Sequence, residues 1–300
     1  MIGGPLYAGV ELGGTKCVVI IARGPEDVLE RTTIPTTTPE ETLGAIEARL
    51  LDGQTAHGFE ALGIASFGPV DLDEQSPSYG HVVRTSKPGW SDTDVARRLE
   101  RATRLPVAFD TDVNGAALSE MRWGAGRGMQ DFAYITVGTG IGVGLVVNGK
   151  PTRGFAHSEL GHIRPVRLRG DEFAGCCPYH GDCAEGLASG PALKARLGGR
   201  SFDDAQEDDP LWETTAWTIA QICHVIVCAA APRAIALGGG VMDRQPHLLQ
   251  RVNRMLGESL NGYMLLPGES DYVRPPALGA NAGPLGAIAL AMSASGRTFA

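Results

Sequence analysis

The segment at residues 154–191 constrains the fold of this chain more than any other, because it concentrates side chains that bind metal ions. Cys177, His180 and Cys183 follow one another at three-residue intervals. A tight turn can direct these side chains at one centre, and His162 lies far enough upstream to complete a tetrahedron. Four protein ligands leave no open position for water, so the sequence predicts a structural zinc site, whose binding energy would order a loop with little core of its own.

The cysteines leave two alternatives open. Cys176 competes with Cys177 as a ligand, and Cys177 is preferred only because it gives the even spacing. The cysteines of this segment can also be reduced thiols of a surface loop that binds no metal. Cys17, Cys223 and Cys228 lie in apolar runs and are expected in the core. Six cysteines without a secretory signal indicate a reducing compartment, and hence a cytoplasmic protein.

Length and charge exclude several classes of protein. A chain of 300 residues is long enough for two domains. The net charge of −8 and the pI near 5.4 argue against nucleic acid or an anionic membrane as the main partner. The longest apolar stretch, at 219–237, is interrupted by His224, Pro232 and Arg233, so a membrane span is not expected.

The order of the predicted elements indicates the fold. Three short β-rich runs, at 7–10, 17–22 and 28–33, predict an antiparallel meander. Helices and parallel strands then alternate, with a helix at 39–51 capped by Thr38, a strand at 61–65, a helix at 92–102, a strand at 107–110 and a helix at 114–123. This order is typical of a ribonuclease-H-like sheet.

The second half of the chain repeats the plan. We expect a β-hairpin from strands at 131–137 and 140–149, then the metal-binding segment, helices near 186–197 and 211–230, a strand at 234–240, and helices near 246–260 and 284–293. The predicted fold class is therefore α/β, with two ribonuclease-H-like domains facing a cleft. The smaller domain is expected at 1–120 and the larger at 121–283, and a C-terminal helix at about 284–300 can pack on the first.

Glycine-rich turns join the first two strands of each half. The first turn contains Gly13, Gly14, Thr15 and Lys16, and the second contains Gly138, Thr139 and Gly140. Such turns let backbone N–H groups approach phosphate oxygens, and a threonine hydroxyl adds a donor. For either turn alone, glycine required for positive φ in a hairpin is an equal explanation, but the repetition favours a clamp on the β- and γ-phosphates. Neither turn has Walker or Rossmann spacing.

A third glycine run ends the predicted strand at 234–240 and precedes a helix. It consists of Gly238, Gly239 and Gly240. Backbone without side chains can pass against a flat ligand such as adenosine, and a plain strand-to-helix turn explains the run equally well.

Acidic residues follow the strand at 107–110, at the end where open α/β sheets bind ligands. Asp112 is the best candidate for a general base, because it follows the strand and a carboxylate can accept the proton of an attacking hydroxyl. The competing role for Asp112 is that of a helix N-cap. Glu11, in the first turn, can hold Mg²⁺ through water.

The metal-binding segment also carries candidates for binding sugar. Glu159, His162 and Glu185 can each hydrogen-bond sugar hydroxyls. If His162 binds zinc through one ring nitrogen, its other nitrogen is free to face a substrate. Such an arrangement would couple the metal site to the sugar pocket.

These residues resemble the ROK family of sugar kinases and regulators, which share the actin/hexokinase-like ATPase fold. The resemblance covers nearly the whole chain. GVELGGTK at 9–16 and VGTGIGVGL at 137–145 resemble the phosphate motifs, DTDVNGAALSE at 110–120 the catalytic segment, HSELGH at 157–162 the E-x-G-H signature and ALGGGVM at 236–242 the adenosine motif. The resemblance implies a base at Asp112, sugar contacts at Gly68, Asp112, Glu159, His162 and Glu185, an ATP site at Gly13, Gly14, Thr15, Lys16, Thr139, Gly140, Gly238, Gly239 and Gly240, and a zinc site at His162, Cys177, His180 and Cys183.

Within the family the likeness is to the bacterial fructokinase branch, through residues 65–80, 87–90 and 177–193 and through Glu11, which stands where other members carry Asp. It implies phosphorylation of D-fructose at the 6-hydroxyl with ATP and Mg²⁺, with mannose or glucose as poorer substrates. Thr111 replaces the asparagine usual in glucokinases, which argues against glucose. Other departures from the family are the Cys-His-Cys set, which fructokinases share, Ser158 for proline and Ala280 for an acid.

Two other functions compete with a kinase. One is a sugar-responsive regulator, but regulators of this family add a DNA-binding domain, and six residues precede the first predicted strand here. The other is an inactive sugar-binding module, which the presence of Asp112 and both phosphate turns argues against. The expected partners are a hexose and ATP, with no nucleic acid or membrane, and the expected assembly is a homodimer.

Overall fold

The computed structural model describes residues 4–296, including all their side chains except those of Asp203 and Glu269. Residues 297–300, which the predicted C-terminal helix included, lie outside the described residues.

Contacts along the chain divide it into two compact units. The first consists of the described residues up to Gly128, of Pro151–His157 and of those from Ala280 onward. The second consists of Met129–Lys150 and Ser158–Gly279. This division differs from the predicted boundary after residue 120, because a helix of the first unit continues to Trp123.

A five-stranded sheet in the order β3-β2-β1-β4-β7 forms the centre of the first unit. The first strand pairs antiparallel with the second, and the second with the third. The fourth strand in sequence, β4, pairs parallel with both β1 and β7. The predicted meander and parallel strands are confirmed as β1 (Tyr7–Leu12), β2 (Lys16–Gly24), β3 (Asp27–Pro35), β4 (Leu62–Ser66) and β7 (Val107–Thr111).

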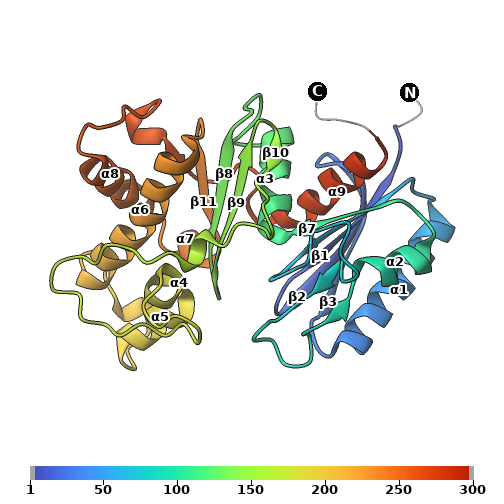
Figure 1. The fold of residues 1–300 in the computed structure, drawn as a ribbon, viewed down its shortest axis with the longest axis horizontal. Coiled ribbons are helices and arrows are strands. Elements are labelled where there is room, and N and C mark those ends of the chain that lie inside the picture. Colours follow the sequence, from blue (N-terminus) through green and yellow to red (C-terminus); the bar gives the residue numbers. More distant parts are fainter. Residues whose placement is uncertain (1–3, 297–300) are drawn as a thin grey trace. The chain divides into compact units, whose positions relative to one another are not determined.

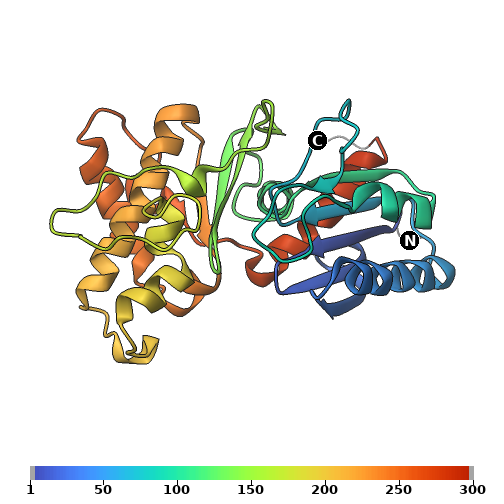
Figure 2. The same cartoon turned by 60° about the horizontal axis from the view of Figure 1, so that its bottom comes forward.

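Helices pack on both faces of this sheet (Figure 1 and Figure 2). On one face, α1 (Pro39–Ala56) joins the apolar core through Leu43, Ile46 and Leu50. On the other, α9 (Ala282–Ala294) approaches so closely that a Cβ on Gly63 would lie 1.9 Å from the Ala287 carbonyl oxygen. α9 also packs along α3 (Asp112–Trp123), which carries the proposed base into the same unit.

The boundaries of the first-unit helices show one confirmed prediction and one error. Thr38 caps α1 as predicted, its side chain accepting a hydrogen bond from the Glu41 N–H. The helix predicted at 92–102 is α2 (Ala96–Thr103), and it begins later. The preceding residues instead form β6 (Thr93–Asp94), which pairs with β5 (His81–Val82), and this pairing is set by residues distant in sequence.

The second unit repeats the plan of the first, with a five-stranded sheet in the order β10-β9-β8-β11-β12. As predicted, β8 and β9 form an antiparallel hairpin, and β11 then pairs parallel with β8 and with β12. The central strand, β8, therefore occupies the place that β1 has in the first sheet. The strands are β8 (Phe132–Val137), β9 (Ile141–Val147), β10 (Lys150–Pro151), β11 (Ile235–Gly238) and β12 (Val273–Arg274).

Helices of the second unit pack around an apolar core that includes α6 and α8. The helix predicted near 186–197 is two helices, because Ser189 ends the first and caps the second. No helix within residues 4–296 combines the length and the apolarity needed to cross a membrane. The helices are α4 (Ala184–Ala188), α5 (Gly190–Leu197), α6 (Pro210–Ala230), α7 (Gly240–Arg244) and α8 (Leu248–Leu260), and the 3-10 turns are η1 (Leu160–His162), η2 (Phe202–Asp204), η3 (Glu269–Asp271) and η4 (Gly279–Asn281).

The six cysteines are all free thiols. Cys17 and Cys223 are buried as predicted, but the prediction for Cys228 is wrong, because it is exposed. Five residues along a helix rotate a side chain by about 140°, so Cys228 lies on a different face of α6 from Cys223.

Candidate active site and metal centre

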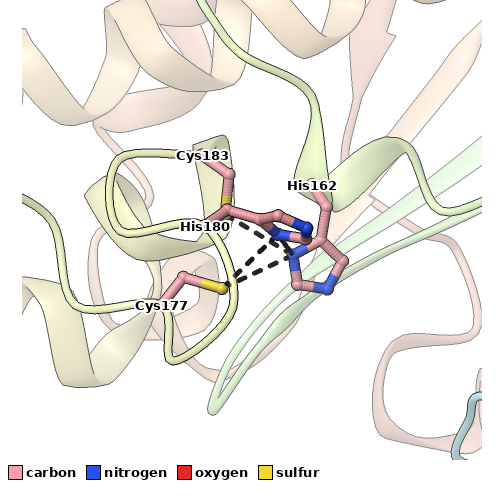
Figure 3. Close-up of side chains that lie close together, drawn as sticks. All are labelled: His162, Cys177, His180 and Cys183. Carbon is pink, nitrogen blue, oxygen red and sulfur yellow. Dashed lines mark hydrogen bonds between the residues drawn. The ribbon is translucent and has the colours of Figure 1, made fainter.

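The four predicted metal ligands lie together in the second unit (Figure 3). One ligand atom from each of His162, Cys177, His180 and Cys183 lies within 4.8 Å of the others. The two Nδ1 atoms of His162 and His180 are 3.3 Å apart, and Cys183 Sγ lies 3.4 Å from His162 Nδ1. Cys177 Sγ lies 3.8 Å from His162 Nδ1 and 3.7 Å from His180 Nδ1.

The four pair distances of 3.3, 3.4, 3.7 and 3.8 Å are close to the edges of a tetrahedral zinc site. With Zn–N bonds of about 2.0–2.1 Å and Zn–S bonds of about 2.3 Å, neighbouring ligand atoms are separated by roughly 3.3–3.8 Å. The donor set, two imidazoles and two thiols, is also one that zinc prefers. Burial raises the pKa of the Cys183 thiol to about 11, so a metal that binds here displaces a proton from it. The residues present therefore fit a structural zinc ion.

Glycines allow the loop to close around this site. Cys177 and Gly181 exchange backbone hydrogen bonds across a tight turn, with Gly181 at a φ of +64°. A Cβ on Gly175 would lie 2.1 Å from the Gly181 carbonyl oxygen, and one on Gly186 would lie 1.9 Å from it. The turn directs Cys177 into the cluster, whereas Cys176 is exposed and not one of the four clustered side chains. This geometry favours Cys177 over Cys176 as the ligand.

An ion pair stabilises the segment that precedes the Cys-His cluster. Arg196 of α5 donates to both carboxylate oxygens of Asp171 at 2.8 and 2.9 Å, and its guanidinium lies over the Phe173 ring. Arg167 donates to the carbonyl oxygens of Asp171 and Phe173. The hydrogen bonds from Arg196 lower the pKa of Asp171, which keeps this largely buried carboxylate charged.

His162 lies between the Cys-His cluster and a proposed sugar contact. Its Nδ1 faces the cluster, and its Nε2 lies 3.9 Å from Glu185 Oε1. Glu185 Oε2 in turn accepts the Ile141 N–H at 3.0 Å, directly after the second glycine turn. A Cβ on Gly140 would lie 2.6 Å from this oxygen. Glu159, the third predicted sugar contact of this unit, is exposed immediately before η1, which ends at His162.

The two glycine turns occupy equivalent places, between β1 and β2 and between β8 and β9. None of Gly13, Gly14, Gly138 and Gly140 has φ in the left-handed region, so the alternative explanation by positive φ does not apply. A Cβ on Gly14 or Gly138 would meet no atom within 4 Å. Neither backbone conformation nor packing within the chain therefore requires glycine at these two positions, which leaves room for a ligand.

The remaining predicted nucleotide contacts lie in the two turns and after β11. Lys16 and Thr15 are exposed in the first turn, Thr139 is exposed in the second, and Lys87 Nζ donates to the Gly14 carbonyl oxygen. Gly238 ends β11 and Gly240 begins α7, as predicted. Between them, Gly239 has a φ of +96°, and a Cβ there would lie 2.6 Å from Val137 backbone atoms. The backbone conformation and the close packing on Val137 therefore require glycine at position 239.

The junction of β7 and α3 presents the proposed base. Thr111 is the helix N-cap, with its hydroxyl accepting the Asn114 N–H at 3.1 Å, so the alternative N-cap role for Asp112 is wrong. Asp112 is the first helical residue, and its Oδ1 accepts the Val113 N–H at 2.8 Å. Asp112 therefore lies at the N-terminus of α3, with its carboxylate held by the backbone of the next residue.

Glu11 carries a perturbed carboxyl group near this base. Burial, and then the charge of Asp112, raise the pKa of Glu11 from 4.5 to about 7, against weaker opposing effects of Lys16 and Arg31. The carboxylate packs so tightly on the start of α9 that a Cβ on Gly283 would lie 1.9 Å from Glu11 Oε1. Two carboxylates in one partly buried place are a donor set that suits Mg²⁺.

We expect this raised pKa to make Glu11 destabilising above neutral pH. Below pH 4.5 the group is protonated in both the folded and the unfolded chain, and it contributes nothing. Between pH 4.5 and about 7 the unfolded chain ionises first, so folding loses free energy as the pH rises. Compared with Glu11→Gln, the wild type should lose up to about 3 kcal/mol of unfolding free energy between pH 4.5 and 8. Denaturant titrations without Mg²⁺ measure this difference, and a difference independent of pH would contradict it.

Comparison with known proteins identifies the family of this chain. The ROK family profile matches residues 7–294. The chain belongs to the ROK family. It is 41% identical over 297 residues to a fructokinase of Zymomonas mobilis, covering 97% of this chain and 98% of that protein.

Solved structures agree with this assignment. The ROK protein described here matches a ROK hexokinase of Thermus thermophilus with a TM-score of 0.80 and 30% identity, over 97% of this chain and 99% of that one. It matches a ROK glucokinase of Streptomyces griseus, in complex with glucose and AMPPNP, with a TM-score of 0.76 and 28% identity, over 96% and 99% of the two chains. The predicted family and the actin/hexokinase-like fold are confirmed.

The structure of this ROK protein also shows contacts around the predicted site residues that the sequence did not indicate. Arg153 lies 2.6 Å from the buried Asp110, and His157 accepts a hydrogen bond from the Val70 N–H at 3.1 Å, two residues after Gly68. Both pairings join residues far apart in the chain, and no local spacing marks them. Gly68 itself lies against the His157 ring, since a Cβ there would be 3.4 Å from His157 Cε1.

Proposed function

We propose that this ROK protein is an ATP-dependent fructokinase that transfers the γ-phosphoryl group to the 6-hydroxyl of D-fructose. The observation that carries the proposal is the similarity to a fructokinase along nearly the full length of both chains. This similarity agrees with the fructokinase activity predicted from the sequence. The local geometry at Asp112, at the two glycine turns and at the Cys-His cluster supports the same activity.

Asp112 is proposed as the general base. Its carboxylate would accept the proton of the fructose 6-hydroxyl as that oxygen forms a bond to the γ-phosphorus, while the bond from phosphorus to the β-γ bridging oxygen breaks and ADP leaves. One oxygen of the Asp112 carboxylate accepts the Val113 N–H, which helps to hold the side chain in place. Mg²⁺, when bound, would neutralise charge on the phosphates, with Glu11 holding it through water.

Two further sets of residues would hold the substrates. Fructose hydroxyls would be bound by Gly68, Glu159, His162 and Glu185, with zinc fixing the ring of His162 through its Nδ1. The ATP phosphates would lie against the two glycine turns, through Gly13, Gly14, Thr15, Lys16, Thr139 and Gly140, and adenosine against Gly238, Gly239 and Gly240. Homodimer formation and a cytoplasmic location remain predictions from the sequence.

We expect Gly138→Ala to weaken ATP binding without destabilising the protein. A methyl group at this position meets nothing within 4 Å in the chain, so it would occupy the space proposed for phosphate. The KM for ATP should rise about tenfold, a loss of about 1.4 kcal/mol, with little change in melting temperature. Gly257→Ala, at an exposed helical glycine that is equally free of contacts, is the matched control. An unchanged KM for ATP would remove this turn from the proposed nucleotide site.

The product identifies the reaction. Purified protein is incubated with Mg-ATP and fructose, and the product is offered to phosphoglucose isomerase coupled to glucose-6-phosphate dehydrogenase. NADPH formation is expected, because only the 6-phosphate enters this sequence. ADP release without NADPH would show phosphorylation at another hydroxyl, and release of neither would favour a sugar-binding or regulatory role.

A further inference from the structure

Asp110 lies two residues before the proposed base, and its side chain is completely buried. Its Oδ1 accepts hydrogen bonds from the Thr111 N–H and from Asn114 Nδ2, each at 2.8 Å. These two partners stand on either side of Asp112 in the chain. The Asp110 carboxylate therefore ties down the backbone before the base and the first turn of α3 after it.

The second oxygen of Asp110 is held by a distant residue. Oδ2 lies 2.6 Å from Nη2 of Arg153, whose side chain is 38% exposed. Arg153 belongs to Pro151–His157, the part of the first unit that lies in sequence between two parts of the second. The other end of this segment is anchored too, since the buried His157 accepts the Val70 N–H.

Both anchors lie at one edge of the first sheet. Val70 follows the end of β4 at Ser66, Asp110 lies near the end of β7 at Thr111, and these two strand ends are paired neighbours. Parallel strands place their carboxyl ends at the same edge, where the proposed base also lies. The segment Pro151–His157, which directly precedes Ser158 and Glu159, is therefore held by these two contacts near Asp112.

Stability alone does not account for this ion pair. Apolar residues of similar volume often stabilise a protein as well as a buried ion pair does, because the pair must recover a large desolvation cost. What an apolar pair cannot supply is the set of directed hydrogen bonds that Asp110 makes on both sides of Asp112. Arg153 supplies the contact that holds the second oxygen of the Asp110 carboxylate in that orientation.

We propose that Arg153 is a positioning residue for phosphoryl transfer, acting through Asp110 to hold Asp112 in the orientation that accepts the substrate proton. The inference rests on the proposed kinase function. Arg153→Met is expected to lower kcat about 10–100-fold, the loss associated with misplacing a catalytic group by about 1 Å. The KM values for fructose and ATP should stay within about threefold, because Arg153 contacts Asp110 and not the substrates in this account.

Two further variants keep the test informative if Arg153→Met folds poorly. Removing one member of a buried pair leaves an unpaired charge that destabilises the fold, so Asp110→Asn/Arg153→Met removes that charge and should fold while kcat stays low. Arg153→Lys should recover most of kcat, because the contact is made through a single nitrogen. Arg49→Met, in an exposed ion pair with Asp52 on α1, is the control and should leave kcat unchanged.

Hydrogen exchange separates this inference from the proposed function. In Arg153→Met, peptides covering residues 107–118 should exchange about tenfold faster than in the wild type, and in Arg153→Lys and Arg49→Met they should not. A wild type without fructose-dependent ADP release would sink the fructokinase proposal, and the exchange data would still decide whether Arg153 orders this segment. Unchanged exchange, or a rise in the fructose KM at constant kcat, would overturn the positioning role.

Discussion

Asp112→Asn is expected to lower kcat for fructose phosphorylation by about 10²–10⁴-fold, the usual contribution of a positioned general base. The amide has nearly the shape of the carboxylate, and its oxygen can still accept the Val113 N–H. The cap by Thr111 is untouched, so α3 should begin as it does in the wild type. The amide oxygen can still accept a hydrogen bond from the sugar hydroxyl but cannot take its proton, so the KM values for fructose and ATP should change less than about threefold.

The control for this substitution is Asp52→Asn, which makes the same chemical change on an exposed side chain of α1. It should leave kcat and both KM values unchanged. Steady-state kinetics in which fructose and Mg-ATP are varied in turn, together with thermal melts of all three proteins, decide the matter. A kcat for Asp112→Asn within tenfold of the wild type, in a folded protein, would mean that another group takes the proton.

Cys183→Ser is expected to abolish zinc binding and to lower the melting temperature by about 10 °C. Zinc binding energy in such sites is folding energy, and the second unit would lose several kcal/mol with the ion. The wild type should contain one zinc per chain, because the cluster offers four ligand atoms within 4.8 Å. Metal analysis of purified protein and calorimetry measure both effects. A wild type that folds without zinc and gains no stability on its addition would contradict the structural role.

Three companion variants sharpen this test. Cys176→Ser and Cys228→Ser alter exposed thiols that are not among the clustered ligands, so both should retain zinc and stability. His162→Gln should lose zinc and also weaken fructose binding at least about tenfold, because its Nε2 lies on the side of Glu185. Loss of zinc with unchanged fructose affinity would refute the coupling of metal site and sugar pocket.

Much of the fold could be predicted because its signals are local. Apolar runs, a capped helix at Thr38 and the order of strands and helices specify both sheets without tertiary information. The errors occur where distant residues decide. Because β5 pairs with β6, α2 begins later than predicted. Cys228 lies on an exposed face of α6, and an apolar run alone could not indicate that exposure. A short run shows that a helix is apolar, but not which of its faces is buried.

The Cys-His cluster could be predicted for a similar reason. Three of its four side chains come from one short segment, so spacing alone brings Cys177, His180 and Cys183 together. The supporting residues give no such signal. Arg153 and Asp110 are separated by many residues, and only the folded chain shows that they form an ion pair. The glycines that let the metal loop close, such as Gly186, are also understood only from the contacts around them.

The central claim is tested most directly by ADP release from the zinc-loaded protein with Mg-ATP, measured side by side with fructose, mannose, glucose and N-acetylmannosamine. We predict the highest kcat/KM with fructose, at least about tenfold above the other sugars, a difference of about 1.4 kcal/mol in transition-state stabilisation. No sugar-dependent ADP release above background, from protein shown to be folded and to contain zinc, would contradict the assignment of a hexose kinase. Preference for another of the four sugars would keep the kinase and overturn fructose.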